Sequence, residues 1–392
     1  MTKVCSEDSV RRAFQRIDPE ACLAWQSRAL QRSWLPALNH PWVLDLDVTV
    51  KPVYGHQEGA SKGYNPHKPG RPSHAYHTLM IRHLRLVLDV EVRSGKEHAA
   101  GHGSANLWRV LDDLPPECRP QLVCGDAGFG NEDLAAACEL RRQNYLFRLR
   151  LTRGVRKLVQ MLEIQGGWKR AIHGWEGIEG TLQLQGWTRS RRVVVYRRLT
   201  QRPSLSGGRK RIGQDELGLA PLQEAPDWEY QVLVSNLETD LVGLCDLYRQ
   251  RADIENAYDE LKNQWGWGGF MTRDLLRCQV SARNVALIYN WWSLFVACAQ
   301  PERGREATTS RPLLLCAVGR VVESGRQLTL RLTSTHAHAA QAQSLLSAVS
   351  LFLSGLTNAA EQLDPKRRWQ RIWDRILSPW LKPQATLGFP SG

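Results

Sequence analysis

The stretch YRQRADIENAYDELK, residues 248–262, decides how the rest of the chain is interpreted. It has the pattern of a charged α-helix, yet Glu255 stands four residues before Asp259, a like-charge spacing that weakens an isolated helix. At about 100° per residue, four of its side chains fall within about a 60° arc of one helix face: Tyr248, Arg251, Glu255 and Lys262. Such a stripe is compatible with a site that binds a cation and an anion together. It is also compatible with a solvated face that carries an Arg251–Glu255 pair.

The charge balance indicates what kind of partner the chain binds. The 392 residues include 52 Lys and Arg against 39 Asp and Glu, which gives a net charge of +13. An excess of this size suits a polyanion, usually a nucleic acid, although a basic but otherwise ordinary enzyme has the same composition. The length is enough for two or three domains.

The cysteines and the apolar segments indicate the compartment. Nine cysteines without a CxxC pair argue against a zinc module or a disulfide framework and for a reducing compartment. The opening residues have no apolar core typical of a signal peptide. The most apolar helix candidate, residues 282–299, contains Arg283, Asn284 and Asn290, so it is predicted to be a buried core helix rather than a membrane span. We therefore expect a cytoplasmic protein without a membrane partner.

The segment WVLDLDVTV, residues 42–50, changes to the period of two that predicts a β-strand. Its aliphatic side chains take one face, and the other face carries Asp45, Asp47 and Thr49. Two carboxylates on one strand face are costly in a core unless a positive charge neutralises them.

The next segments predict more strands and helices of one α/β domain. Two strands over 75–84 and 85–95 are predicted to form a hairpin or a meander and are followed by a helix over 104–115. A strand then ends at Asp126 in a Gly-rich turn, before a helix over 131–143 and a strand over 144–151. Residues 152–240 have a weaker, mostly β pattern and are predicted to be an insertion.

In a sheet with this order the first and fourth strands are neighbours, so Asp47 and Asp126 can meet at one edge. A helix crossing that edge can bring Glu255 to them. Three converging carboxylates can hold two divalent cations about 3.5–4 Å apart for phosphoryl transfer. Mg²⁺ suits such a site because it is a hard ion that prefers carboxylate oxygens and water.

The connection YGHQEGASKGYNPHKPGRPS, residues 54–73, is long, polar and basic. Loops of this length are uncommon unless they are functional or disordered. Four of its residues can meet phosphates or remain solvated: Lys62, His67, Lys68 and Arg71.

These motifs together resemble the DDE transposases of bacterial insertion sequences. DLDVT surrounds Asp47, VCGDAGFGN surrounds Asp126, and residues 248–262 match a Tyr-x2-Arg-x3-Glu-x6-Lys signature at all four positions. The segment over 54–72 is similar to one characteristic of a branch of these enzymes. The resemblance covers about residues 41–300 and implies a ribonuclease-H-like mixed sheet flanked by helices and interrupted by a β-rich insertion.

The resemblance also implies the roles of the site residues. Asp47, Asp126 and Glu255 would be the catalytic, metal-binding carboxylates for two Mg²⁺ or Mn²⁺ ions. Asp47 is preferred to Asp45 because it matches the Asp-x-Thr form. DNA phosphates would be held by Tyr248, Arg251 and Lys262.

The activity implied is cut-and-paste DNA transposition in a bacterial cytoplasm, at the nucleoid when the enzyme acts. The partners would be terminal inverted repeats, target DNA and, in the synaptic complex, a second copy of the chain. Two alternatives remain open, namely a nuclease of the same fold without strand transfer and a catalytically inactive or domesticated copy that binds DNA.

The expected organisation has five segments. A helical N-terminal segment over 1–40 is a DNA-recognition region shorter than in relatives, and a C-terminal region over 301–392 is a candidate for dimerisation. Between them, the catalytic domain has a first part over 41–151 and a second part over 241–300, separated by the β-rich insertion over 152–240. Within the last segment, an apolar stripe at helical spacing can pack on its own domain or on a second protomer. It consists of Trp369, Ile372, Trp373 and Ile376.

Overall fold

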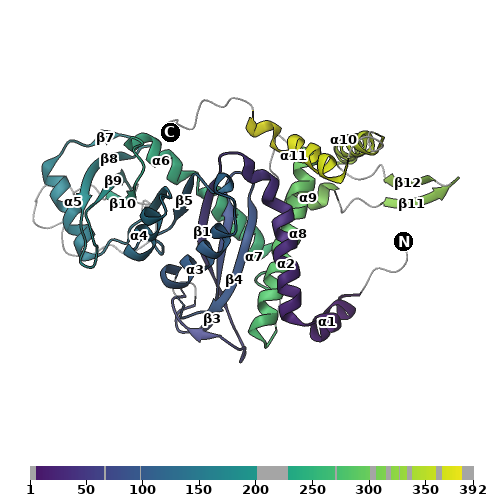
Figure 1. Ribbon diagram of the computed structural model, residues 1–392, viewed down its shortest axis with the longest axis horizontal. Helices are drawn as coiled ribbons and strands as arrows, with labels where there is room; N and C mark the ends of the chain where they lie inside the picture. The colour runs from purple at the N-terminus through teal and green to yellow at the C-terminus, as the bar shows by residue number, and fades with distance from the viewer. Residues whose placement is uncertain are drawn as a thin grey trace, which may run out of the picture. The chain divides into compact units, whose positions relative to one another are not determined.

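A computed structural model gives the fold of the protein (Figure 1). It describes residues 6–65, 68–97, 99–200, 228–269, 272–300, 306–314, 319–325, 327–332, 338–358 and 364–381. The chain divides into two compact units, the first formed by Met1–Val123 with Gln250–Gly392 and the second by Cys124–Arg249.

The sheet of the first unit is built around one central strand. Strand β3 (Pro72–Ile81) pairs antiparallel with β1 (Val43–Pro52) and with β4 (Leu86–Ser94), and the short β2 (Ser61–Lys62) pairs with its first residues. The tight β3–β4 connection places Arg85 at a φ of 51°. This arrangement confirms the hairpin that the sequence predicts.

Strand β5 (Leu122–Gly125) is the neighbour of β1 on its other side. The Gln121 amide, just before β5, donates to the Trp42 carbonyl, just before β1, at 3.0 Å. Because the two strands begin at the same end, they run parallel. The sheet is therefore mixed, and the predicted neighbourhood of the first long strand and the strand before Asp126 is confirmed.

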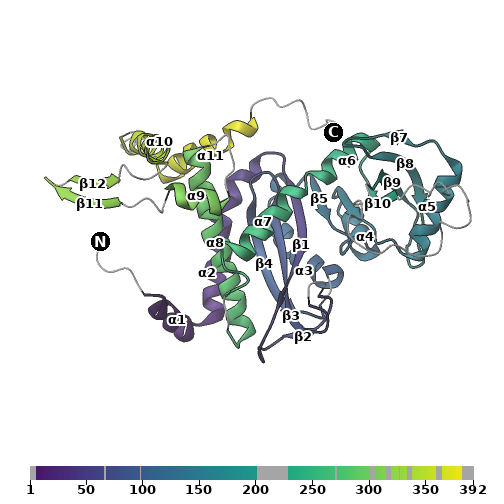
Figure 2. The same ribbon diagram turned by 180° about the vertical axis from the view of Figure 1, so that it is seen from behind.

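Helices cover both faces of this sheet. Helix α3 (Ala99–Asp112) lies over the strands in Figure 1, whereas α7 (Ala252–Asn263) lies over them in the reverse view of Figure 2. Helix α8 (Leu275–Ala299) packs with α7 on the same face, where Ile254, Tyr258 and Leu261 of α7 join the valines of β4 in one apolar cluster. This cluster is the main core of the unit.

The polar residues of α8 bond to β4 and to α2 (Pro19–Trp34), which runs beside α8 in both views. The completely buried Asn290 amide accepts from the Val87 N–H and donates to the Val87 carbonyl, both at 2.8 Å. Arg283 donates to Asp89 at 2.9 Å. The expectation that this apolar segment is a core helix is confirmed, and its polar side chains satisfy groups that burial would otherwise leave unpaired.

The first unit also contains several further helices and a two-stranded hairpin. They are α1 (Glu7–Arg16), the short η1 (Leu35–Asn39) and η2 (Pro116–Cys118), α9 (Ala307–Leu314), the hairpin of β11 (Gly319–Ser324) and β12 (Gln327–Leu332), α10 (Ala339–Asn358) and α11 (Pro365–Leu381). In the described part of the chain, α10 is the one helix long and apolar enough to cross a membrane, which alone is weak evidence for a span.

The C-terminal helix α11 packs on α8 of its own unit. Trp369 lies against Trp291 with ring centroids 5.5 Å apart, and the Arg375 Nε donates to the Cys298 carbonyl at 2.8 Å. Trp373 is completely buried. The apolar stripe of the tail therefore docks on its own domain, because α8 offers an aromatic surface there, and it is not the surface for a second protomer.

The second unit contains an antiparallel sheet in the order β6-β10-β9-β8-β7. Its strands are β6 (Tyr145–Arg148), β7 (Lys169–Arg170), β8 (Glu176–Leu182), β9 (Arg191–Leu199) and β10 (Trp228–Ser235), and its helices are α4 (Glu132–Leu140), α5 (Arg153–Gln165) and α6 (Leu241–Arg249). Four of these strands, β7 to β10, lie within the residues predicted to be a β-rich insertion. The fold class of a mixed sheet flanked by helices is confirmed.

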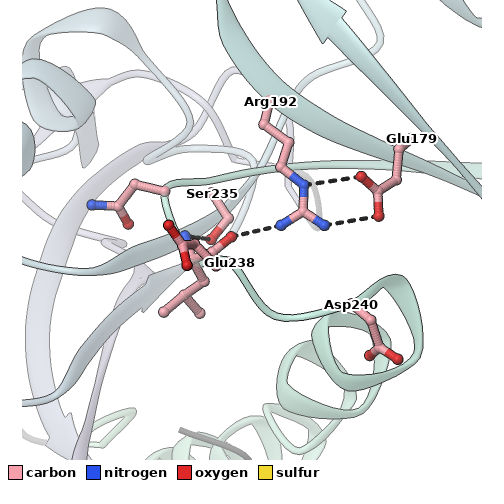
Figure 3. Close-up of a pocket in the computed structure, with 7 residues that line it drawn as sticks. Glu179, Arg192, Ser235, Glu238 and Asp240 are labelled. Atoms are coloured by element: carbon pink, nitrogen blue, oxygen red, sulfur yellow. Dashed lines mark hydrogen bonds and ion pairs between the residues drawn. The ribbon is translucent and has the colours of Figure 1, made fainter. Parts of the chain in front are cut away.

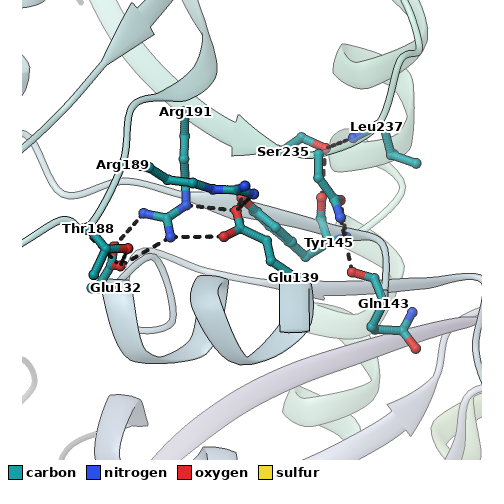
Figure 4. Close-up of polar contacts among 10 residues, drawn as sticks. Glu132, Glu139, Gln143, Tyr145, Thr188, Arg189, Arg191, Ser235 and Leu237 are labelled. Atoms are coloured by element: carbon teal, nitrogen blue, oxygen red, sulfur yellow. Dashed lines mark hydrogen bonds and ion pairs between the residues drawn. The ribbon is translucent and has the colours of Figure 1, made fainter. Parts of the chain in front are cut away.

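Arginines of β9 are neutralised by glutamates within the second unit. Arg191 bonds to both Glu132 and Glu139, as Figure 4 shows. Arg197 is ion-paired with Glu163 at 2.6 Å and lies 4.1 Å and 4.2 Å from the rings of Trp168 and Trp228. The basic and aromatic residues of the insertion thus stabilise its own sheet.

Candidate active site

Two carboxylates of β1 lie on the same strand face but in different environments. Asp45 is completely buried, and Arg82 donates to it from Nε at 2.6 Å and from Nη2 at 2.9 Å. Arg251 adds a third bond from Nε at 3.2 Å. With two guanidinium groups around it and no access to solvent, Asp45 is a structural ion-pair centre.

Asp47 is the more accessible of the two acids. Its side chain is 22% exposed, and the Arg251 Nη2 lies 3.5 Å from its Oδ1. Arg251 also donates to the Leu46 carbonyl at 3.2 Å. One buried guanidinium therefore spans Asp45 and Asp47, and it offsets the charge repulsion that the sequence pattern of β1 poses.

The structure corrects the single helix predicted over residues 248–262. Helix α6 ends at Arg249, and α7 begins at Ala252. Gln250 and Arg251 form a turn between them, with Arg251 at the N-cap of α7. The predicted stripe is thereby divided between two helices, because the Arg251 side chain turns inward to the buried acids of β1.

The Arg251 side chain, predicted to contact a phosphate, is buried in this structure. Its guanidinium is 4% exposed and is directed at Asp45 and Asp47. The Glu255 carboxylate forms no ion pair with a described residue. The alternative prediction of an Arg251–Glu255 pair is therefore wrong.

Glu255 and Lys262 both lie on α7. Glu255 is in its first turn and exposed, and Lys262 is half-buried in its last turn. An acid near the N-terminus and a base near the C-terminus both complement the helix dipole. The buried face of the same helix carries Tyr258, whose pKa is raised by burial and by the nearby charges of Asp47 and Asp45. Its phenol is therefore neutral.

Asp126 and Tyr248 belong to the second unit. Asp126 directly follows β5, is half-buried, and accepts the Gly128 N–H on Oδ1 at 2.8 Å. The following turn is tight, since a Cβ on Gly130 would lie 2.1 Å from the Arg148 carbonyl oxygen. Tyr248 is half-buried near the end of α6.

The three predicted metal ligands are thus located on β1, after β5 and on α7. In the described residues, no group of three or more His, Cys, Asp or Glu is close enough to hold a metal ion. The chemistry of the donors still fits a hard divalent cation, since all three are carboxylates with accessible surface.

Sequence reasoning missed one structural residue of this site and the buried pairing of another. Arg82, directly after β3, binds Asp45, and Arg251, which was predicted to contact DNA, is the second guanidinium. The available signal was the pair of carboxylates two residues apart, which requires buried positive charge, but the spacing does not say which arginine provides it.

A pocket in the second unit, about 500 Å³ in volume, is separate from the predicted ligands (Figure 3). It is lined by Glu179, Glu238 and Asp240 around Arg192, whose guanidinium is bonded to Glu179 and to the carbonyls of Leu237 and Thr239. No residue predicted for catalysis lines it.

The chain has similarity to a protein family and to a solved structure. None of the curated proteins matches the chain. Among solved structures, it is similar to a piggyBac transposase in a cryo-EM structure of a synaptic complex with hairpin DNA, with 12% identity and a TM-score of 0.38. The similarity covers 89% of this chain and 59% of that chain. Residues 1–352 match the family described as transposase DDE domain group 1, and the chain therefore belongs to the DDE transposase family.

Proposed function

We propose that this protein is a DNA transposase that cleaves strands at the ends of an insertion sequence and transfers them to target DNA by a cut-and-paste route. The observation that carries the proposal is Asp47 on β1, partly exposed and held by Arg251. Arg251 directly precedes the helix that carries Glu255. Family membership supports the same activity.

Asp47, Asp126 and Glu255 would hold two Mg²⁺ or Mn²⁺ ions. When bound, such ions supply an activated nucleophile and stabilise the leaving oxygen of an in-line displacement. A ribonuclease-H-like arrangement of the catalytic strands is supported by β1, which has antiparallel β3 on one side and parallel β5 on the other.

The protein's own residues orient these carboxylates. Asp45 fixes the Arg251 guanidinium, and Arg251 in turn limits the rotation of Asp47, so that one oxygen keeps a defined direction. Arg251 acts through Asp47 and is a positioning residue. Lys262 and Tyr248 remain the proposed contacts to DNA phosphates, since both retain accessible surface.

A homodimer on paired ends is part of the proposal. Helix α10 contains no charged residue and exposes Leu351 by 78% and Leu353 by 43%. An exposed apolar helix of this kind suits contact with a second copy. The bacterial origin and the action at the nucleoid in the cytoplasm are proposed with the family resemblance.

The test compares cleavage of DNA carrying the ends of the element by the full chain and by Asp47→Asn, Asp126→Asn and Glu255→Gln. Each substitution should abolish cleavage in Mg²⁺ and leave duplex binding within about twofold, because it removes a metal ligand only. Asp259→Asn is the matched control, since Asp259 is an exposed acid on the same helix and should keep activity.

The outcomes separate the alternatives. Cleavage by Asp126→Asn at the normal rate contradicts the site. A full chain that binds the ends but never cuts them is an inactive DNA-binding copy, and one that cuts without joining 3′ ends to a target is a nuclease.

A further inference from the structure

The connection between β1 and β3 presents aromatic and basic side chains to solvent. Tyr54 is 61% exposed and Tyr64 is 71% exposed. Three cationic side chains of the same connection are exposed as well: Lys62, Lys68 and Arg71. We call these five residues the basic loop surface.

Two of the cations are arranged around one tyrosine. The Lys68 ammonium donates to the Tyr54 hydroxyl, and the Arg71 Cζ lies 4.4 Å from the centre of the Tyr54 ring. Cation–π contacts at exposed sites contribute about 0.5–1 kcal/mol each. The hydrogen bond from Lys68 lowers the pKa of Tyr54. Two charges are thereby gathered on one rigid aromatic ring instead of moving independently.

The backbone of this connection is fixed to the scaffold by other residues. The Glu58 carboxylate accepts the Leu275 N–H at the start of α8 at 3.0 Å, and the Glu58 N–H donates to the Arg273 carbonyl at 2.8 Å. The buried Asn65 side chain accepts the Lys68 N–H at 3.0 Å. Gly63 leaves no room for a Cβ, which would lie 1.7 Å from the Gly95 carbonyl oxygen. Anchoring residues face inward, and the aromatic and cationic ones face outward.

The charge of this surface is not compensated internally. Within the described residues, Lys62, Lys68 and Arg71 form no salt bridge with a carboxylate. The arginines of β9 in the second unit differ, since Arg191, Arg192 and Arg197 are each paired with glutamates. Of these two basic regions, the loop therefore has positive charge available to an external anion.

We propose that the basic loop surface binds the phosphate backbone of duplex DNA, as a contact additional to the residues of the Tyr-x2-Arg-x3-Glu-x6-Lys signature over 248–262. Lysine, arginine and tyrosine hydroxyl groups are the usual donors to phosphate oxygens, and phosphate contacts position a protein without reading sequence. Few aliphatic side chains are exposed there, so the chemistry fits a polyanion better than an amphipathic peptide. The inference rests on the proposed function.

The test is the salt dependence of binding to a fluorescent mixed-sequence duplex, measured by anisotropy with the full chain. The variant is Lys68→Ala/Arg71→Ala. Each lost phosphate contact should reduce the slope of log K against log salt by about 0.9, and affinity at about 50 mM salt should fall by at least tenfold. The control, Arg320→Ala/Arg331→Ala on the β11–β12 hairpin, removes the same net charge from exposed positions.

Tyr54 provides a second, independent readout. Tyr54→Phe keeps the ring that organises Arg71 and removes the hydroxyl that binds Lys68, whereas Tyr54→Ala removes both. Binding should weaken in the order wild type, Tyr54→Phe, Tyr54→Ala, while the thermal unfolding midpoint stays unchanged because the side chain is exposed.

The results distinguish this inference from the proposed function. If the loop variant and the control lose equal affinity, net charge alone explains binding and the loop surface is wrong, while transposase activity stands. If the wild-type chain does not bind duplex DNA, both proposals fail. Binding of an acidic peptide in place of duplex DNA also overturns the inference.

Discussion

At the scale of single residues, the feature that decides the site is the difference between two aspartates on one strand face. Asp45 is enclosed by Arg82 and Arg251, whereas Asp47 lies 3.5 Å from Arg251 and is partly exposed. A carboxylate that already neutralises two buried guanidinium groups is unavailable to a metal ion. The geometry therefore supports the proposal that Asp47, rather than Asp45, is the metal ligand.

Substituting these two aspartates should give opposite results. Asp45→Ala leaves two buried guanidinium groups without their partner and should lower the free energy of unfolding by about 3–5 kcal/mol. Asp47→Ala removes a partly exposed carboxylate and should cost about 1 kcal/mol or less while it abolishes cleavage. Urea denaturation followed by tryptophan fluorescence measures both. Equal destabilisation by the two substitutions contradicts the assignment.

At the scale of elements, β9 is held to α4 by a network of carboxylates around one arginine (Figure 4). Desolvation alone would raise the pKa of Glu139, but hydrogen bonds from Arg191, Arg189 and Tyr145 outweigh it and lower the pKa to about 2. The pKa of Glu132 is also lowered by its bonds to Arg191 and Thr188, against a desolvation effect that raises it.

This network predicts an acid-dependent loss of stability. A carboxyl whose pKa is depressed by folding stabilises the protein above its unfolded value of about 4.3, and this contribution disappears as the pH falls towards about 2. The urea midpoint should therefore fall between those pH values. Glu139→Gln, which cannot titrate, should show a smaller decline over the same range; an identical decline in both proteins means that Glu139 does not contribute.

At the scale of the whole molecule, the C-terminal helix α11 contributes buried side chains to the core of the first unit. Trp373, Ile376 and Leu377 of α11 are at most 2% exposed. Burying a side chain of this size stabilises a fold by about 1.5–3 kcal/mol. The tail is therefore part of the core of this unit, and its basic residues Lys366, Arg367 and Arg371 remain on the exposed side.

Deletion of residues 364–392 should accordingly destabilise the protein before any effect on assembly is seen. We expect a lower unfolding temperature or an insoluble product, because Trp291 and the end of α8 lose their cover. The control is a deletion that starts at residue 382 and keeps α11. A truncated protein that lacks α11 but melts at the wild-type temperature would show that this docking contributes little.

The sequence by itself determined the order of strands and helices and the three candidate carboxylates, because these follow from periodicity and element boundaries along the chain. It also indicated the family, through the resemblance of three short motifs. Tertiary structure alone decided which aspartate of β1 is accessible, since Arg82 and Arg251 stand 37 and 206 residues from Asp45. It also decided that the helix breaks before Ala252 and that the tail covers α8. These outcomes depend on which distant groups become buried together, and local patterns of hydrophobicity and charge do not contain that information.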